Sequence, residues 1–453
     1  MLSAFVNTFK ITELRHRILF TFGLIYICRL ISAVPLPGVD AVAIREYVAG
    51  MGGGGGLAGM LDLFSGGALM QCTIGTLGIM PYISASIILQ LMTAVIPHLE
   101  KLAREGDVGR QKITQYTRYL TVVICVAQGA VMGIALTTAA EQGSAISQYF
   151  GLPLSVVQMP KLGFILLTSI SLLTGSLLLM WVGEQITDRG IGNGISLIIT
   201  VNIISRLPFA IKTLVDKLTP VDGVAEIGIF HVSLLLALMF FVILGVVAIT
   251  QAQQKVPVQF AKRMVGRKMM QGGNSNLPLR VNYSGVMPII FASAILAIFP
   301  KLGSMLPWQA AKQWASSFPL SYWYMFWFGM MILFFSYFWV ATQFNPIQIA
   351  DDLKRRGGYI PGIRPGRPTA EHLDRVMTRL TLAGAVFLTI IAVMPNVMNR
   401  QFNVDWIVAS FFGGTSLLII VGVMLDTMRQ IESHLLMRHY DGFLKKGKMR
   451  GRR

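Results

Sequence analysis

The nine residues GIMPYISAS at positions 78–86 return as GVMPIIFAS at positions 285–293. Six of the nine positions are identical, and each copy lies in a long apolar run. A second pair follows in the same order, since GISLII at 194–199 and GTSLLI at 414–419 share four of six residues. Two matched pairs in one order predict an internal repeat of the kind found in membrane proteins.

The chain holds ten apolar runs of about the length that a helix needs to cross a bilayer, which is about 20 residues. Of its 453 residues 54% are hydrophobic and only 13% are charged, whereas a soluble domain carries roughly 25% charge. This composition excludes a soluble globular protein, and it excludes a disordered chain, which requires low hydrophobicity. The ten predicted spans cover residues 17–35, 71–96, 114–138, 161–182, 193–212, 229–250, 283–302, 321–343, 376–395 and 406–428.

The repeat pairs fall in spans 2 and 7 and in spans 5 and 10, so each pair is five spans apart. Because five is odd, the second half enters the membrane in the opposite orientation, which is typical of inverted repeats with a functional path near the midplane. The predicted fold is an all-α polytopic membrane protein with ten transmembrane helices as two inverted five-helix halves around a central pore. The halves are residues 1–228 and 229–428, and a basic tail follows at 429–453.

The net charge of +18 lies almost entirely on one predicted side of the membrane. With the N-terminus in the cytosol, 30 of the 39 Lys and Arg residues fall in cytosolic segments, as the positive-inside rule requires. We therefore expect both termini in the cytosol and a first span that is retained, not cleaved as a signal peptide. The two longest cytosolic connections, 252–281 and 344–375, are also basic. Connections of this length are usually functional or disordered.

The repeat also matches apolar side chains that could meet inside the membrane. Pro81 and Pro288 occur early in their spans and are expected to kink them, because proline lacks a backbone donor. Two residues after each proline stands an isoleucine, and the second repeat pair supplies two more. Four branched apolar side chains at one level would form a hydrophobic constriction that gates by dewetting. The four isoleucines are Ile83, Ile290, Ile199 and Ile419.

Motifs of common catalytic and metal sites do not occur. The sequence has neither a phosphate-binding G-x-x-x-x-G-K-[ST] nor H-E-x-x-H, and its three cysteines provide no disulfide framework. No metal, cofactor or enzymatic activity is predicted. The main alternative is an inverted-repeat secondary transporter of a small solute, which would usually carry acids at mid-membrane. The apolar runs hold few ionisable residues, and two of these, Arg29 and Asp426, lie near span ends.

Nine strings, in order along nearly the whole chain, resemble the SecY family of protein-translocon channel subunits. The strings are VPLPGVD (34–40), LFSGGAL (63–69), LGIMPYISASIILQL (77–91), QKITQYTRY (111–119), WVGEQITDRGIGNGIS (181–196), NYSGVMPIIFAS (282–293), PGIRPG (361–366), DRVMTRLTLAG (374–384) and FGGTSLLI (412–419). The glycine run at 52–56 departs from the family pattern, and Gly-rich segments are typical flexible linkers.

The resemblance implies a pore ring, a plug and a lateral gate. The ring would add Ile79 to the four isoleucines above. Spans 2 and 3 would face spans 7 and 8 across the gate, where Ser86, Gln90, Gln128 and Asn282 are placed. The amides among them are also ordinary candidates for interhelical hydrogen bonds. A short plug helix would lie at about 57–67, although an interfacial helix is the alternative for this stretch. The plug residues would be Leu57, Met60, Leu61, Leu63, Phe64, Ser65, Gly66 and Gly67.

Arg364 matches the arginine of the family's PGIRPG loop, which the resemblance assigns to docking of an ATP-driven motor and of the ribosome. The prolines and glycines around it predict a tight turn that displays the guanidinium to partners. Clustered basic residues on long loops suit ribosomal RNA phosphates or an acidic motor surface, although a plain positive-inside charge run is the alternative. The docking residues are Arg364, Lys255, Lys262, Arg263, Arg267, Lys268, Lys354, Arg355 and Arg356.

The function that the resemblance implies is a passive conduit in the bacterial plasma (inner) membrane. It would translocate secretory polypeptides and release hydrophobic segments sideways into lipid, with energy from a partner. The implied partners are SecE-like and SecG-like small membrane subunits, a SecA-like ATPase motor, the ribosome through large-subunit RNA and proteins, a secretory preprotein with its signal peptide, and membrane lipid.

Overall fold

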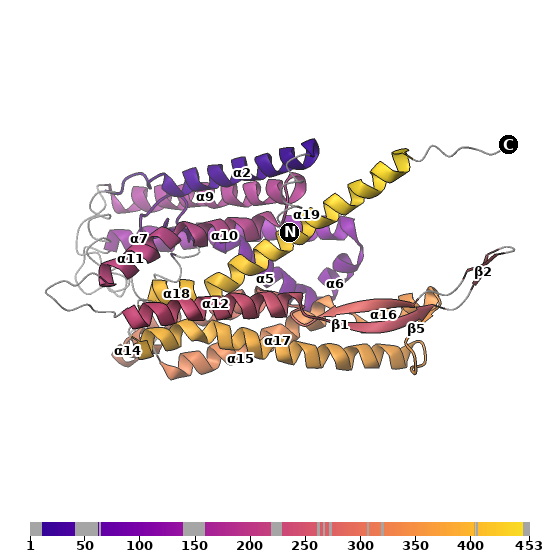
Figure 1. The fold of residues 1–453 in the computed structure, drawn as a ribbon. Coiled ribbons are helices and arrows are strands. Elements are labelled where there is room, and N and C mark those ends of the chain that lie inside the picture. Colours follow the sequence, from indigo (N-terminus) through magenta and orange to yellow (C-terminus); the bar gives the residue numbers. More distant parts are fainter. Residues whose placement is uncertain are drawn as a thin grey trace. The chain divides into compact units, whose positions relative to one another are not determined.

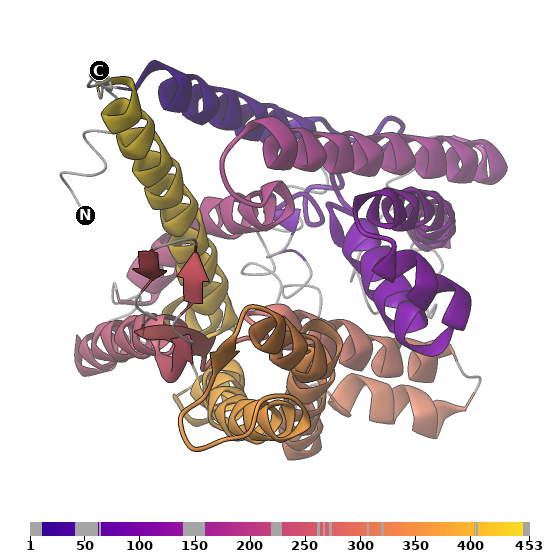
Figure 2. The ribbon, with the colours of Figure 1, turned by 90° about the vertical axis from the view of Figure 1, so that its right-hand side faces the viewer.

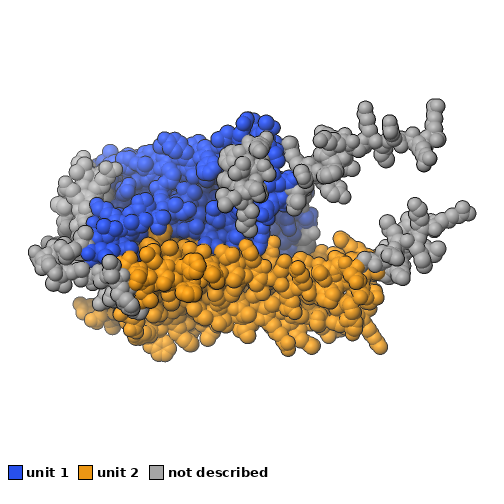
Figure 3. Space-filling view, in the orientation of Figure 1, with its two compact units in different colours: residues 1–227, 405–408, 419–453 blue, residues 228–404, 409–418 orange. Residues whose placement is uncertain are grey.

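A computed structural model of the chain describes residues 11–40, 62, 65–138, 159–218, 229–260, 263–265, 268–270, 274–305, 308–318, 321–402, 404 and 406–446. It divides into two compact units, drawn in different colours in Figure 3. Unit 1 comprises residues 1–227, 405–408 and 419–453, and unit 2 comprises residues 228–404 and 409–418.

Unit 1 is a bundle of apolar helices. The α2 helix lies beside α9, and α7 packs along α9 as well (Figures 1 and 2). The α10 helix begins at a proper cap, because the side chain of Asn193 accepts a hydrogen bond from the backbone N–H of Ser196 at 3.2 Å. The helices are α2 (Thr12–Ala33), α5 (Met80–Val95), α6 (Pro97–Arg104), α7 (Asp107–Thr138), α9 (Lys161–Arg189), α10 (Gly194–Ser205) and α11 (Leu207–Leu218).

Unit 2 holds a second set of helices, in which α15 lies beside α17. These two approach closely at Gly329, where an added Cβ would lie 2.8 Å from Cγ2 of Thr389. The helices are α12 (Ile229–Gln251), α13 (Met287–Met305), α14 (Gln309–Ser317), α15 (Tyr322–Gln343), α16 (Pro346–Arg355) and α17 (Arg367–Phe402). Two further helices, α18 (Trp406–Gly413) and α19 (Thr415–Lys446), contribute residues to both units.

The 252–281 connection contains β-strands, which the sequence analysis did not predict. Strand β1 (Gln253–Phe260) pairs antiparallel with β4 (Asn274–Arg280) and with β5 (Gly358–Tyr359), so the order is β4-β1-β5. A separate two-stranded ladder joins β2 (Arg263–Val265) to β3 (Lys268–Met270). The sheet joins both long connections of unit 2, because β5 belongs to 344–375.

This sheet has a buried apolar face. Side chains alternate between the two faces of a strand, and in β1 Val256 and Val258 are buried while Lys255 is exposed. Val256 and Val258 belong to one apolar cluster with Phe344 and Leu373, which lie just after α15 and in α17. The long connections are therefore anchored to the helices of unit 2, not held only at their ends.

Each predicted span coincides with at least one helix. Among the described residues, eight helical stretches are long and apolar enough to cross a membrane, and the α5–α6 pair would make nine. That pair is bent by 105° where Pro97 opens α6, and α13, at predicted span 7, is not among the eight. The count of ten is thus not reproduced by length and hydropathy alone. The helices are those of a multi-pass membrane protein, and the inverted relation of its halves stays a prediction.

Candidate functional site

The two copies of the first repeat both begin a helix. Helix α5 starts at Met80, so Pro81 is in the first turn, and α13 starts at Met287, so Pro288 has the same place. A proline there loses no helical hydrogen bond, because the first N–H groups of a helix have no partner within it. The prediction that Pro81 and Pro288 kink their helices is therefore wrong. In each copy a glycine with positive φ precedes the helix, Gly78 at +56° and Gly285 at +62°.

All five predicted ring residues are buried, whereas some isoleucines on the same helices are exposed. Ile88 on α5 is 40% exposed and Ile204 on α10 is 42% exposed. Ile79 packs beside α9, because a Cβ added to Gly183 would lie 3.6 Å from its Cδ1. The exposed fractions of the ring residues are 2% for Ile79, 9% for Ile83, 5% for Ile199, 7% for Ile290 and 3% for Ile419. Their convergence into one ring stays a prediction.

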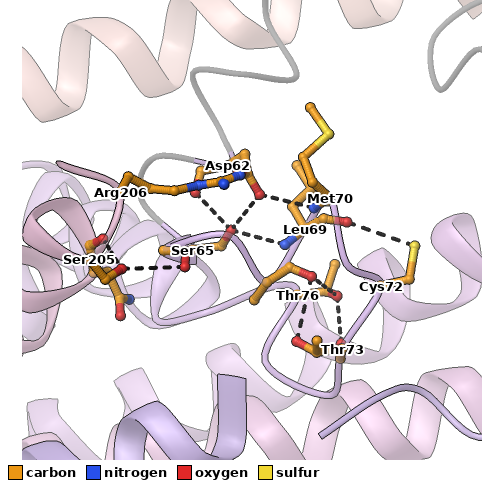
Figure 4. Close-up of polar contacts among 12 residues, drawn as sticks. Asp62, Ser65, Leu69, Met70, Cys72, Thr73, Thr76, Ser205 and Arg206 are labelled. Atoms are coloured by element: carbon orange, nitrogen blue, oxygen red, sulfur yellow. Dashed lines mark hydrogen bonds and ion pairs between the residues drawn. The ribbon is translucent and has the colours of Figure 1, made fainter. Parts of the chain in front are cut away.

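A buried carboxylate organises the chain just before α5. Asp62 is 2% exposed, and its Oδ1 accepts hydrogen bonds from the Met70 N–H at 2.9 Å and from the Ser65 hydroxyl at 3.4 Å (Figure 4). Its carbonyl accepts from the Gly67 N–H at 3.1 Å, and the Ser65 hydroxyl accepts from the Leu69 N–H at 3.1 Å. These bonds hold residues 65–70 in a compact turn around one acid.

Two arginines from other helices meet this turn. Arg206, at the end of α10, forms an ion pair with Asp62, and the two side chains are only 14% and 3% exposed (Figure 4). Arg29 of α2 donates from Nη2 to the Gly66 carbonyl and from Nη1 to Oδ1 of Asn202, each at 3.4 Å. We call Asp62, Arg206 and Arg29 the charge cluster. It joins the turn to α2 and α10 within unit 1.

Of the predicted plug residues, the structure describes Ser65, Gly66 and Gly67. Both glycines have positive φ, +69° and +96°, a conformation that other residues rarely adopt. Sequence reasoning did not identify Asp62 as a site residue, although one acid in the apolar string MLDLF was a signal for it. The predicted plug positions that lie outside the described residues are Leu57, Met60, Leu61, Leu63 and Phe64, and the glycine run 52–56 lies outside them as well.

Two of the four predicted gate residues carry a buried oxygen without a hydrogen-bond partner among the described residues. On α5, Nε2 of Gln90 donates to the Ser86 hydroxyl at 3.3 Å. The Oε1 atom of Gln90 and the Oδ1 atom of Asn282 are buried and have no hydrogen-bond partner among the described residues. Gln128, on α7, is half-buried. Buried polar groups are normally paired, so these two oxygens depart from the usual pattern, and their place at a gate stays a prediction.

The PGIRPG segment is a rigid turn with an exposed arginine. Gly362 and Gly366 have φ of +83° and +104°, and Ile363 packs on the apolar cluster under the sheet. The Arg364 carbonyl accepts the Thr369 hydroxyl at 2.9 Å, which ties the turn to the start of α17. The Arg364 side chain itself is exposed. The loop is therefore held by the packing of Ile363 and by the hydrogen bond from Thr369, while the guanidinium of Arg364 is exposed to solvent.

The other predicted docking residues that the structure describes lie in or next to β1, β2, β3 and α16 of unit 2. Lys255 is exposed on β1, and Lys354, Arg355 and Arg356 are exposed at the end of α16. Arg263 lies in β2 and Lys268 in β3. Lys262 and Arg267 lie outside the described residues. Since β1 and β5 pair, the two basic connections are parts of one small sheet.

The SecY family model matches residues 73–428. The chain belongs to the SecY family. Protein translocase subunit SecY of Chlamydia trachomatis is 42% identical over 98% of this chain and 99% of its own length. Protein translocase subunit SecY of Streptomyces scabiei is 43% identical over 98% of this chain and all of its own length. Matches of such coverage mean that the SecY resemblance extends over the described parts of both units.

Solved structures agree at the level of the fold. A structure described as that of a protein conducting channel matches with a TM-score of 0.59 at 18% identity, covering 92% of this chain and 91% of its own. A second, in which the plug domain of SecY is said to stabilise the closed state and maintain a membrane seal, matches with a TM-score of 0.58 at 19% identity and the same coverage. Sec61 of a canine ribosome–channel complex gives 0.54 at 16% identity.

The SecY family match contains the string GIGNG, which forms a turn between α9 and α10 held by three side-chain oxygens. Thr21 of α2 accepts from the Ile191 N–H at 3.2 Å, Thr187 of α9 accepts from Gly194 at 2.9 Å, and Gln430 of α19 accepts from Gly192 at 2.8 Å. Ile199 comes five residues after Gly194 on the helix that this turn starts. Three helices of unit 1 therefore set the position of α10.

Proposed function

We propose that this chain is the channel-forming subunit of a protein translocase, through which secretory polypeptides cross the membrane. The observation that carries the proposal is membership of the SecY family over nearly the full chain, combined with buried isoleucines at matched positions of its repeat. An apolar constriction of this kind would close around a threaded polypeptide and limit ion flow by dewetting.

Directional transport is supplied by a partner in this proposal. Arg364 stands exposed on a rigid turn, and exposed cations on β1 and α16 accompany it. Guanidinium groups suit recognition of carboxylates and phosphates, so an acidic ATP-driven motor or ribosomal RNA fits this surface. Small membrane subunits of the SecE and SecG type would complete the complex. The chain would lie in a bacterial plasma membrane with both termini in the cytosol.

The same channel is proposed to release apolar segments sideways into lipid between spans 2 and 3 and spans 7 and 8. Support comes from the polar groups at these spans, since the buried oxygens of Gln90 and Asn282 have no partner among the described residues. A gate closed by a few polar contacts can open at low cost when an apolar signal peptide arrives. The family's gate residues Ser86 and Gln128 would take part.

A photoreactive residue at Ile83 or Ile290 should crosslink to a stalled secretory precursor in vesicles that contain the reconstituted complex. The crosslink is expected because both side chains would line the polypeptide path. The same probe at Ile88, which is 40% exposed on α5, is the control and should label lipid instead. Absence of precursor crosslinks at both ring positions, together with saturable uptake of a small solute, would favour a secondary transporter.

Charge reversal by Arg364→Glu should lower ATP-driven translocation about tenfold or more, because like charges facing an acidic partner cost several kcal/mol and about 1.4 kcal/mol is tenfold in binding. The measurement is precursor protected from protease per unit time in the same vesicles. Arg110→Glu, at an exposed position in the first turn of α7, makes the same charge change and should have little effect. Equal losses in both variants would mean that net charge, not docking at Arg364, is the cause.

A further inference from the structure

We propose that the charge cluster of Asp62, Arg206 and Arg29 holds the described part of the predicted plug segment, Asp62 and residues 65–67, in its resting position and thereby sets how readily the channel opens. The inference rests on the proposed function, because only a channel has a plug to hold. It goes further in assigning residues of this chain that neither the repeat nor the predicted site includes. Its basis is a buried acid on the segment that pairs with Arg206, together with Arg29 of a second helix, which donates to the Gly66 carbonyl of the segment.

The acid is built into the segment and not merely close to it. Asp62 is nearly fully buried and accepts from the Met70 N–H and the Ser65 hydroxyl, so its carboxylate is oriented by the segment's own turn. The Ser65 hydroxyl also accepts from the Leu69 N–H, which fixes that side chain in turn. Replacing Asp62 would therefore remove hydrogen bonds within the turn as well as the ion pair with Arg206.

The cations belong to helices that the segment must leave if it moves. Arg206 caps α10, and Ser205 beside it donates to the Gly66 carbonyl at 3.4 Å. Arg29 reaches the same carbonyl from α2. The contacts that these residues make with the segment exist only while it lies against α2 and α10. They stabilise the resting state and are lost when the segment departs.

Glycine at positions 66 and 67 makes this approach possible. A Cβ added to Gly66 would lie 2.6 Å from Nη1 of Arg29 and 3.0 Å from the Cα of Asn202. A Cβ added to Gly67 would lie 3.3 Å from Cζ of Arg206. Any larger residue would push the segment away from the two guanidinium groups. The glycine pair thus serves contact with the cluster in addition to the turn that its positive φ values allow.

Of the three charged residues in the cluster, Asp62 should have the largest effect on whether the segment stays in place, because it balances the positive charges. Arg29 and Arg206 lie against the adjacent glycines Gly66 and Gly67, so their like charges repel, and Asp62 is the carboxylate that pairs with Arg206. Removing one partner of a buried ion pair leaves a charge that burial disfavours. Without Asp62 two like charges would remain, whereas without Arg206 the carboxylate would keep its hydrogen bonds from Met70 and Ser65. Loss of the acid should therefore release the segment more completely.

The test measures ion conductance of the resting complex in planar bilayers, with the whole translocase purified. Asp62→Asn should raise resting conductance about tenfold or more, and Arg206→Gln should raise it by less. The double variant Asp62→Asn with Arg206→Gln separates release from misfolding. It removes the pair without leaving either partner unpaired, so it should recover thermal stability in detergent while the conductance stays high.

The control breaks a different ion pair between helices of unit 1. Arg118 of α7 and Glu184 of α9 form a two-pronged pair with distances of 2.9 and 2.7 Å, and Arg118→Gln with Glu184→Gln should leave resting conductance unchanged. Wild-type conductance in Asp62→Asn, or equal leak in the control, would overturn the inference. ATP-driven translocation by the wild-type complex is measured alongside. Translocation together with unchanged conductance in Asp62→Asn would refute only the proposed role of the charge cluster. Absence of translocation by the wild-type complex would refute the proposed function.

Discussion

Leucine at Gly129 or at Gly133 should destabilise unit 1 by about 3 kcal/mol or more, since overpacking a well-packed site costs about 1–3 kcal/mol even where only side chains must move. At Gly129 and Gly133 the atoms nearest to an added side chain belong to the backbone of α9, which cannot move aside as a side chain can. A Cβ at Gly129 would lie 2.9 Å from the Cα of Ser169, and a Cβ at Gly133 would lie 3.0 Å from the Cα of Ile165. The two glycines are four residues apart on α7 and therefore form one face against α9, as in the G-x-x-x-G pattern of membrane helices.

The measurement is the temperature at which the detergent-solubilised protein loses its folded, monodisperse form, together with its yield in membranes. Gly163→Leu is the matched control, because Gly163 lies on α9 with no atom within 4 Å of an added Cβ. That variant should keep wild-type stability. Wild-type stability in Gly129→Leu would mean that α7 and α9 can separate without loss, contrary to the packing in the structure.

Serine in place of ring isoleucines should make the open channel leak ions around a stalled precursor. Ile199→Ser with Ile419→Ser puts hydroxyls where buried apolar groups stand, at 5% and 3% exposure. Wetting of an apolar constriction opens it to ions. A barrier lowered by about 1.4 kcal/mol corresponds to about a tenfold rise in flux, and two substitutions should reach at least that. The measurement is conductance of single channels that hold an arrested precursor.

Ile204→Ser is the control for this prediction, because Ile204 is on the same helix as Ile199 and is 42% exposed. It should leave ion flux unchanged. Equal conductance in the ring variant and in wild type would remove Ile199 and Ile419 from the constriction. The proposed charge cluster would then still be testable, since its conductance is measured without a precursor.

Several elements could be predicted from the chain because their causes are local. Every apolar run that was predicted as a span coincides with a helix, since length and hydrophobicity are properties of the run itself. The turn around Arg364 was also foreseen, because proline and glycine restrict or free the backbone wherever they occur. Family membership followed from ordered strings along the chain and is confirmed by the family match and the relatives.

Other features were missed for physical reasons that can be named. The strands β1 and β4 lie in a connection that was read only for its charge, although V-P-V and L-P-L show the alternation of a half-buried strand. The start of α5 at Met80, later than the predicted span, follows from a glycine-rich turn that the apolar composition concealed. The spacing of Gly129 and Gly133 was a readable signal for close helix packing that the span search ignored.

The length and hydrophobicity of the apolar runs are properties of the sequence, and they were enough to define a multi-pass membrane protein, while the ordered strings identified its family. The pairing of Asp62 with Arg206 could not be predicted from the sequence, because the partners are far apart in the chain and no local pattern indicates that they meet. Folding brings α2, α10 and the turn before α5 together, and only then does the cost of burying charge select which acid meets which arginine.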